Sequence, residues 1–216
     1  MKKIEEPNIT VRDGVFWPSH GAQIILECMK ENPDIFNGKS ILDIGCGTWI
    51  LAIFAAKIWA SRVCASDIDS RAIENTKANA IENEVDIDAR IWNYGVPFWK
   101  EKFDVVIANL PQEKSTWFVN MRWNESILAF LPDAERYIKP GGKLILAING
   151  CTPYKETIEE IQKNWTISKA KWRRVEVKKW VQENIQFFLT GDAVVWDKKD
   201  WYETPIFYLV LERKTS

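Results

Sequence analysis

Histidine and cysteine are scarce in this sequence of 216 residues. His20 is the only histidine, so no histidine-rich metal site is possible and one imidazole at most is available for acid–base chemistry. The four cysteines are far apart and include no Cys-x-x-Cys pair. That spacing fits neither a zinc site nor a disulfide framework, so we expect no bound metal, reduced thiols and a cytoplasmic protein. The cysteines are Cys28, Cys46, Cys64 and Cys151.

The sequence also lacks long apolar runs and an excess of either charge. No apolar stretch approaches the ~20 residues that a membrane-spanning helix requires, and none follows the charged N-terminal residues, so we expect neither a membrane protein nor a secreted one. Lys and Arg total 29 against 30 Asp and Glu, which gives a net charge of −1. We therefore do not expect nucleic-acid binding driven mainly by counterion release, although a local basic face stays open as an alternative.

Short apolar segments alternate with helical stretches along the chain, with no repeat or Gly/Ser linker between them. This alternation predicts an α/β fold with right-handed crossovers and a doubly wound, mostly parallel sheet. We expect one domain over residues 1–216, with an N-terminal helical cap at 1–38 and an insertion at 181–203. Pro140-Gly141-Gly142 is expected to form a turn before a strand. The expected strands are Ser40–Ile44, Arg62–Asp67, Ile87–Trp92, Phe103–Ala108, Lys143–Ile148 and Ile206–Glu212, and the expected helices are Gly21–Lys30, Ile50–Ala60, Arg71–Ala80, one within Glu125–Ile138, and Lys155–Asn164.

The densest motif is a glycine turn, Asp43-Ile44-Gly45-Cys46-Gly47-Thr48-Trp49, between the first of these strands and its helix. Glycines let the backbone turn tightly and approach a ligand that faces the amides of the helix N-terminus. Asp67 ends the next strand, 22 residues beyond Gly45, where a carboxylate can accept hydrogen bonds from both hydroxyls of a ribose. The turn and the acid together predict an adenosyl-binding site.

The same motif departs from a dinucleotide fingerprint. That fingerprint has a third glycine three residues after the second, where this chain has Ile50. The carboxylate of Asp43 would repel a pyrophosphate, whereas it could offset the positive charge of a sulfonium or an amino group. A cationic nucleoside is therefore the better ligand for this turn.

From Val15 to the C-terminus, the chain resembles the class I S-adenosylmethionine-dependent methyltransferases. The resemblance rests on the glycine motif, on Ala65–Asp69 around the ribose acid, on Phe103–Asn109 and on Lys139–Leu144. It implies a Rossmann-like sheet of seven strands with an antiparallel last strand, and adenosylmethionine lying over the ends of the first strands. It places Ile68 against the adenine and Trp92-Asn93 beside the adenine amino edge. The implied cofactor contacts are Asp43, Gly45, Cys46, Gly47, Asp67, Ile68, Asn93 and Asn109.

Trp49 departs from the family pattern, which usually has a third glycine at this position. The indole either projects into the packing of the following helix or occupies the space that the methionine moiety needs. The first alternative is favoured because the rest of the motif is intact. The second would leave a non-catalytic binding module whose tryptophan-rich face docks a partner.

Asn109-Leu110-Pro111-Gln112 follows the fourth expected strand and resembles the Asn-Pro-Pro-Tyr motif of methyltransferases that act on planar nitrogens, such as the release-factor glutamine and N6-adenine enzymes. The resemblance implies that the Asn109 side-chain oxygen and the Leu110 carbonyl, next to Pro111, accept hydrogen bonds from the target amino group. Gln112 replaces the aromatic residue that would stack on a base or an amide, which argues against a nucleic-acid or glutamine substrate. The structural alternative is a capped turn after a buried strand.

Tryptophan is abundant, with 12 in the chain. Gln112–Asn124 follows the acceptor motif directly, and aromatic side chains in such a loop can wall a substrate pocket or fill the core. Val15–Gly21 resembles the Pro-containing stretch that closes over the cofactor in these enzymes. In it, Ser19 is a helix cap, and His20 is either a proton acceptor or a structural residue. The candidate substrate contacts are Trp17, His20, Gln112, Trp117 and Trp123.

Lys163–Lys179 is basic, with tryptophans interleaved. Such a segment can track single-stranded nucleic acid, but a lysine-protected edge strand is the favoured interpretation. We therefore expect an enzyme that transfers the methyl group of S-adenosylmethionine to a nitrogen of a protein side chain or a small molecule. An N-methyltransferase of RNA or DNA bases is the alternative, and the oligomeric state stays open.

Overall fold

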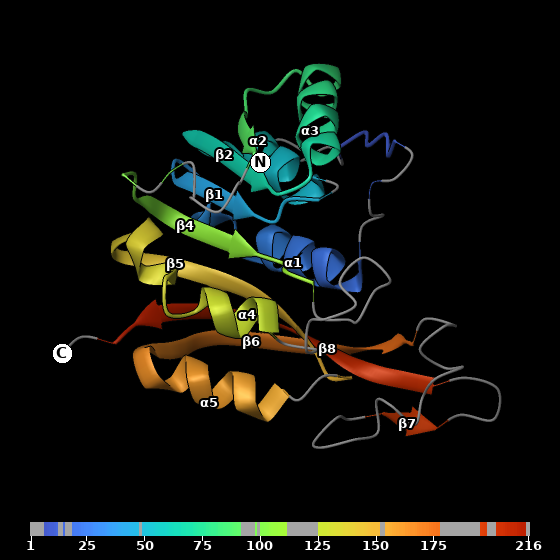
Figure 1. The fold of residues 1–216 in the computed structure, drawn as a ribbon, viewed down its shortest axis with the longest axis vertical. Helices are drawn as coiled ribbons and strands as arrows, with labels where there is room; N and C mark the ends of the chain where they lie inside the picture. Colours follow the sequence, from blue (N-terminus) through green and yellow to red (C-terminus); the bar gives the residue numbers. More distant parts are fainter. Residues whose placement is uncertain are drawn as a thin grey trace.

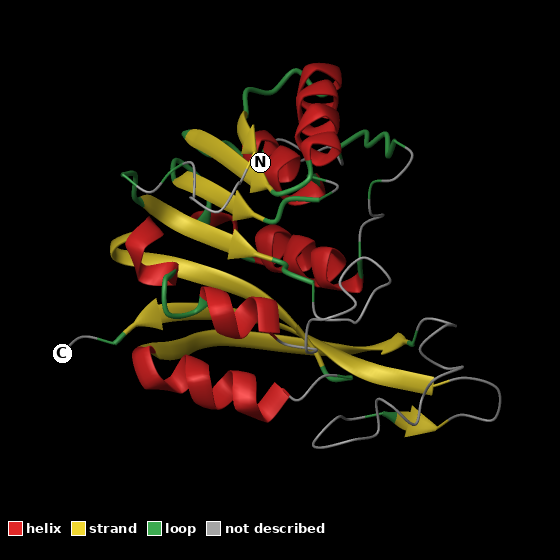
Figure 2. Cartoon of the chain, viewed as in Figure 1, coloured by secondary structure: helices red, strands yellow, loops and turns green. Residues whose placement is uncertain are grey.

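A twisted β-sheet runs through the molecule with helices on both faces, as the computed structural model shows (Figures 1 and 2). The structure describes residues 7–12, 15, 19–47, 49–91, 98, 100–111, 125–151, 154–177, 195–197 and 202–214. The strands are β1 (Ser40–Ile44), β2 (Arg62–Asp67), β3 (Asp88–Ile91), β4 (Phe103–Ala108), β5 (Ile138–Asn149), β6 (Trp165–Glu176), β7 (Trp196–Asp197) and β8 (Tyr202–Arg213). The helices are α1 (His20–Glu31), α2 (Ile50–Lys57), α3 (Ser70–Glu82), α4 (Glu125–Phe130) and α5 (Tyr154–Asn164), with 3₁₀ turns at Pro33–Ile35 and Ala134–Tyr137.

The strand order is β3-β2-β1-β4-β5-β8-β6, and the short β7 pairs with β8 outside this path. The five strands from β3 to β5 are parallel, and β8 is antiparallel to both of its neighbours, β5 and β6. Parallel neighbours need crossover connections, which the helices between them supply. The predicted doubly wound sheet with an antiparallel last strand is confirmed.

The central strand β4 is buried on both faces, which explains why its sequence is almost wholly apolar. Val105 and Ile107 lie in the core that α1, α2 and α3 cover, whereas Val106 and Ala108 lie in the core on the other face, which α4 and α5 cover. Successive side chains of a strand point to opposite faces, so a strand covered on both faces has no polar side. This burial fixes the position of the residues that follow β4.

Several predicted boundaries differ from the structure: the helix expected at Ile50–Ala60 ends at Lys57, and the strand expected from Ile87 begins at Asp88. Two further differences have clear physical reasons. Pro140-Gly141-Gly142 does not form a turn that precedes a strand. It lies inside β5, at a register shift opposite Asp104 of β4. A Cβ on Gly142 would lie 2.9 Å from the backbone oxygen of Asp104, so the glycine allows this irregular stretch to stay within the sheet. β8 begins at Tyr202, four residues before the predicted Ile206, because its first residues pair with the end of β6.

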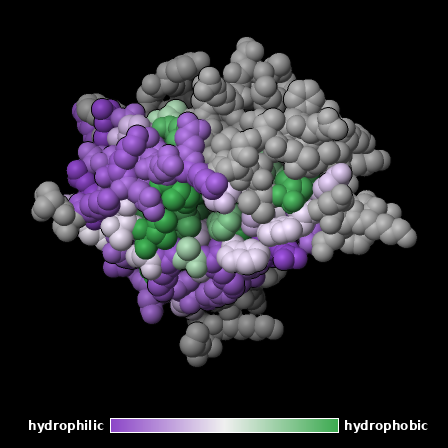
Figure 3. Space-filling model, turned by 90° about the horizontal axis from the view of Figure 1, so that it is seen from below, coloured by the Kyte–Doolittle hydropathy of each residue, from purple (hydrophilic) through white to green (hydrophobic). Residues whose placement is uncertain are grey.

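The strand β6 forms an edge of the sheet, as predicted for the basic segment. Its basic side chains pair with acids of α1: Lys171 contacts Glu31, and Arg173 Nη1 lies 2.7 Å from Glu27 Oε1. Among the described residues seen from below the view of Figure 1, hydrophilic ones surround an apolar area (Figure 3). Much of the positive charge of β6 is thus balanced within the protein.

Two asparagines of α3 and the asparagine that caps its C-terminal end hold residues 8–12 along the helix. Asn75, Asn79 and Asn83 recur every fourth residue and are buried, and their side-chain oxygens accept hydrogen bonds, each of 2.9 Å, from the backbone N–H groups of residues 12, 10 and 8. Asn79 Nδ2 also donates to the Thr10 carbonyl at 2.9 Å. The described helical part of the region 1–38 is α1 and the 3₁₀ turn after it. Most of the segment 181–203 lies outside the described residues.

We expect Asn79→Ala to release this segment and to lower the free energy of unfolding by about 2 kcal/mol, because it removes two hydrogen bonds and leaves the backbone N–H of Thr10 without its acceptor. Hydrogen exchange at residues 8–12 and urea unfolding measure the two effects. The control is Lys77→Ala on an exposed position of the same helix, which should change neither quantity. Equal exchange rates in both variants would contradict the account of the asparagines.

Candidate active site

The glycine turn lies where β1 ends, at the carboxyl edge of the parallel strands (Figure 1). Gly45 and Gly47 have positive φ angles of 67° and 48°, which favour glycine. A Cβ on Gly45 would lie 2.9 Å from Leu110 Cδ2, so the first glycine also permits close packing against the end of β4. The N–H groups of Gly45 and Cys46 donate to the Ser66 carbonyl at 2.9 and 3.0 Å, which ties the turn to β2.

Asp67 is held by backbone N–H groups on both carboxylate oxygens. Oδ2 accepts from Gly47 N at 2.8 Å, and Oδ1 accepts from Asp69 N at 2.9 Å. Burial raises the pKa of Asp67, whereas these two hydrogen bonds lower it. Ile68 follows and is 61% exposed. Each carboxylate oxygen of Asp67 keeps a further lone pair. The two oxygens can therefore accept hydrogen bonds from two hydroxyls beside the exposed side chain of Ile68.

Asp43 is the most unusual group of the site, because it is only 1% exposed and neither carboxylate oxygen has a hydrogen-bond partner among the described residues. Burial, with the nearby charge of Asp67, raises the pKa of Asp43 to about 8, and the backbone of Ala52 opposes this rise only weakly. A buried polar group without a partner is costly and calls for a ligand or water. Asp43 is thus suited to a cationic ligand.

Trp49 is fully buried in the apolar core to which α1 and α2 contribute, and it adopts a left-handed φ of 60°. The indole thus packs within this apolar core and does not project into solvent. The indole N–H faces the thiol of Cys46 without reaching hydrogen-bond geometry. Burial raises the pKa of Cys46 well above its ordinary value, so the thiol stays neutral.

Asn109 lies directly after β4 and contacts the beginning of α1. Its Nδ2 donates to Ser19 Oγ at 3.1 Å, and the same oxygen caps α1 by accepting from Ala22 N at 3.2 Å. His20 begins α1, and its Nδ1 is buried without a partner in the described part of the chain. Pro111 is exposed at the surface. The cap predicted at Ser19 is therefore also a contact of the acceptor motif.

The ends of β1, β2 and β4 are neighbours in the sheet, so the structure brings the predicted residues on these three strands to one edge. The sequence does not predict two contacts of the site: the hydrogen bonds to the Ser66 carbonyl, for which no side chain gives a signal, and the close approach of Asn109 to Gly21, the first residue of an expected helix. No group of three or more metal-ligating side chains occurs within the described ranges, and no helix there is long and apolar enough to cross a membrane. The predicted residues outside the described ones are Trp17, Thr48, Trp92, Asn93, Gln112, Trp117 and Trp123.

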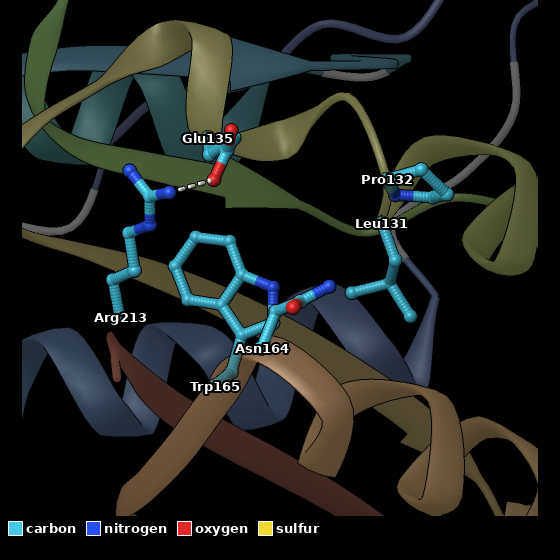
Figure 4. Close-up of a pocket in the computed structure, with 6 residues that line it drawn as sticks. All are labelled: Leu131, Pro132, Glu135, Asn164, Trp165 and Arg213. Carbon is cyan, nitrogen blue, oxygen red and sulfur yellow. Dashed lines mark ion pairs between the residues drawn. The ribbon is translucent and has the colours of Figure 1, made fainter. Parts of the chain in front are cut away.

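A pocket of about 290 Å³ lies elsewhere, between the end of α5 and the 3₁₀ turn at Ala134–Tyr137 (Figure 4). Arg213 Nη2 and Glu135 Oε2 form an ion pair of 2.6 Å across it. None of the predicted site residues lines this pocket, so it is separate from the glycine turn. Its lining residues are Leu131, Pro132, Glu135, Asn164, Trp165 and Arg213.

The strand order, in which β8 lies antiparallel between β5 and β6, together with a glycine turn after β1 and an acid at the end of β2, is typical of the class I methyltransferase fold. The sequence profile of the family "Methyltransferase small domain" matches residues 8–174, and the chain belongs to this family.

Curated relatives match shorter segments. The chain is 42% identical over 76 residues to "Ribosomal protein L11 methyltransferase" of Thermotoga maritima, which is 35% of this chain and 28% of that protein. It is 35% identical over 124 residues to "Probable protein arginine N-methyltransferase 6" of Arabidopsis thaliana, which is 55% of this chain and 26% of that protein. The chain thus spans about a quarter of the length of these relatives. The crystal structure of ribosomal protein L11 methylase from Lactobacillus delbrueckii subsp. bulgaricus shares the fold, with a TM-score of 0.62 at 18% identity over 93% of this chain and 82% of that one.

The site residues fit adenosylmethionine. Asp67 offers two oriented oxygens to ribose hydroxyls, Ile68 offers an apolar surface to a base, and the unpartnered carboxylate of Asp43 suits a positive charge.

Proposed function

We propose that the protein transfers the methyl group of adenosylmethionine to a nitrogen atom of a protein side chain. The observation that carries this proposal is the Asn109 carboxamide at the end of β4, next to Leu110, which packs against Gly45 of the glycine turn. An amide oxygen and a backbone carbonyl at this place can accept both N–H groups of an amine. The names of the curated relatives, which refer to protein substrates, support a protein acceptor over a small molecule.

In this proposal Asp67 and the glycine turn bind the nucleoside, and Asp43 offsets the positive charge of the donor. Adenosylmethionine, when bound, supplies an electrophilic methyl group on a sulfonium. The Asn109 oxygen and the Leu110 carbonyl orient the acceptor nitrogen, as in the Asn-Pro-Pro-Tyr motif, so that its lone pair faces the methyl group. Catalysis is then chiefly positioning and electrostatics. His20, near this end of α1, is the candidate acceptor of the proton that the nitrogen releases.

The alternative of a nucleic-acid substrate is less well supported. A basic strand that binds nucleic acid needs free positive side chains, but Lys171 and Arg173 are engaged by acids of α1. The alternative of a blocked, non-catalytic module requires the buried Trp49 indole to occupy the space of the methionine moiety, and a structure with bound adenosylhomocysteine distinguishes this placement from packing against the helices.

The proposal is tested with methyl-labelled adenosylmethionine and the protein, RNA and metabolite fractions of source cells that lack this gene. We expect label in the protein fraction, on nitrogen. Label in RNA would instead support a base N-methyltransferase, and label in metabolites alone would support a small-molecule acceptor. The absence of transfer to every fraction would contradict the proposal.

We expect Asn109→Ala to lower turnover about 100-fold while the Kd for adenosylhomocysteine changes less than twofold, because the side chain orients the acceptor and not the donor. Initial rates with the labelled donor and calorimetry measure the two quantities. The matched control, Asn37→Ala, removes an exposed asparagine before β1 and should leave both unchanged. Full turnover of Asn109→Ala would show that the acceptor nitrogen is held elsewhere.

A further inference from the structure

Both ends of the Asn109 carboxamide contact the first turn of α1. Nδ2 donates to Ser19 Oγ at 3.1 Å. A Cβ on Gly21 would lie 2.2 Å from Asn109 Oδ1 and 3.2 Å from Ala147 Cβ. The amide oxygen thus occupies the space that a side chain at residue 21 would fill.

The backbone conformation of residue 21 does not require a glycine. Glycine weakens a helix, and Gly21 is not among the glycines of the described chain that have a positive φ. The three atoms nearest to a Cβ at residue 21 would be Asn109 Oδ1, Asn109 Cγ and Ala147 Cβ. The close approach of the Asn109 oxygen is therefore the reason for a residue without a side chain.

We infer that Ser19 and Gly21 are positioning residues that set the orientation of the Asn109 carboxamide; this inference rests on the proposed function. The Ser19 oxygen takes the amide N–H, so the amide oxygen is left to accept the N–H of the methyl acceptor. In the reverse orientation the NH₂ group would compete for the lone pair of the acceptor nitrogen and keep it from the methyl group. Among the described residues, the hydrogen bond of the carboxamide is the one that Nδ2 donates to Ser19.

The test compares Ser19→Ala, Asn109→Ala and the double variant, with labelled adenosylmethionine as donor and the undermethylated protein fraction as acceptor. We expect Ser19→Ala to lower turnover about tenfold, with the Kd for adenosylhomocysteine within twofold of the wild-type value. In the Asn109→Ala background the same change should alter turnover less than twofold. Ser19→Thr, which keeps the hydroxyl and the helix cap, should restore most of the rate.

The cycle separates positioning from helix capping, because the cap is lost in both Ser19→Ala variants. If the double variant loses turnover by the product of the two single losses, the inference is overturned while the proposed function stands. The same holds if Ser19→Ala keeps full turnover and Asn109→Ala is inactive. If Asn109→Ala is fully active, the proposed function fails instead. In that case the side-chain NH₂ signals of Asn109 in ¹⁵N NMR spectra test the orientation of the carboxamide without reference to turnover. A clear shift of these signals in Ser19→Ala supports the contact with Ser19, and unchanged signals overturn it.

Discussion

Asp67→Ala is expected to weaken the binding of adenosylhomocysteine about 30-fold, or about 2 kcal/mol, as for the loss of charged hydrogen bonds. The structure gives two reasons. The carboxylate is oriented by N–H groups of Gly47 and Asp69, so its remaining lone pairs are already placed for the ribose. Its removal also leaves the Gly47 N–H without an acceptor, which loosens the glycine turn. Isothermal calorimetry measures the change.

The control for this prediction is Asp86→Ala, which removes an exposed carboxylate before β3. It should leave the affinity within twofold, because surface charges at a distance are screened. Asp67→Asn should fall between the two variants, because one oxygen acceptor remains. Unchanged affinity of Asp67→Ala would reassign the ribose site and, with it, the role of the glycine turn.

Asp43→Asn is expected to stabilise the ligand-free protein at alkaline pH and to weaken cofactor binding. The pKa of Asp43 is raised from 3.8 to about 8, so the folded protein binds a proton that the unfolded chain releases above about pH 4. The stabilisation from this proton is complete below about pH 4 and is lost as the pH rises through about 8. At pH 9 the variant should exceed the wild type by about 1–3 kcal/mol, because it avoids a buried charge.

The same substitution should raise the Kd for adenosylmethionine at least tenfold, or about 1.4 kcal/mol, because the carboxylate that offsets the positive charge of the ligand is gone. Thermal unfolding from pH 5 to pH 9 and calorimetry give the two quantities. A matched variant is Asp34→Asn, an exposed acid in the 3₁₀ turn, which should follow the wild type in both. Parallel stability curves of wild type and Asp43→Asn would contradict the assigned burial of charge.

The local patterns of the sequence predict the sheet well. The bounds of β1, β2 and β4 agree with the structure, since these strands are buried on both faces and end at turn residues. The glycine turn and Asp67 are also predictable, because the chemistry of the site depends on residues close in sequence to strand ends. The same holds for the cap at Ser19.

The contacts between distant segments are not predictable in this way. Asn109 and Ser19 are 90 residues apart, and their hydrogen bond depends on how α1 packs over β5 and β8. The sequence shows that Asn75, Asn79 and Asn83 are four residues apart. It does not show that they bind the backbone of residues 8–12. The extension of β8 to Tyr202 depends on its pairing with β6.

The central claim is that the adenosyl group binds between the glycine turn and Asp67 while Trp49 stays in the helix packing. A crystal structure of the protein grown with adenosylhomocysteine tests it most directly. The account predicts that both ribose hydroxyls donate to the Asp67 carboxylate and that the indole keeps its buried position. An indole found in the space of the methionine moiety, with no ligand density beside Gly45, would contradict it.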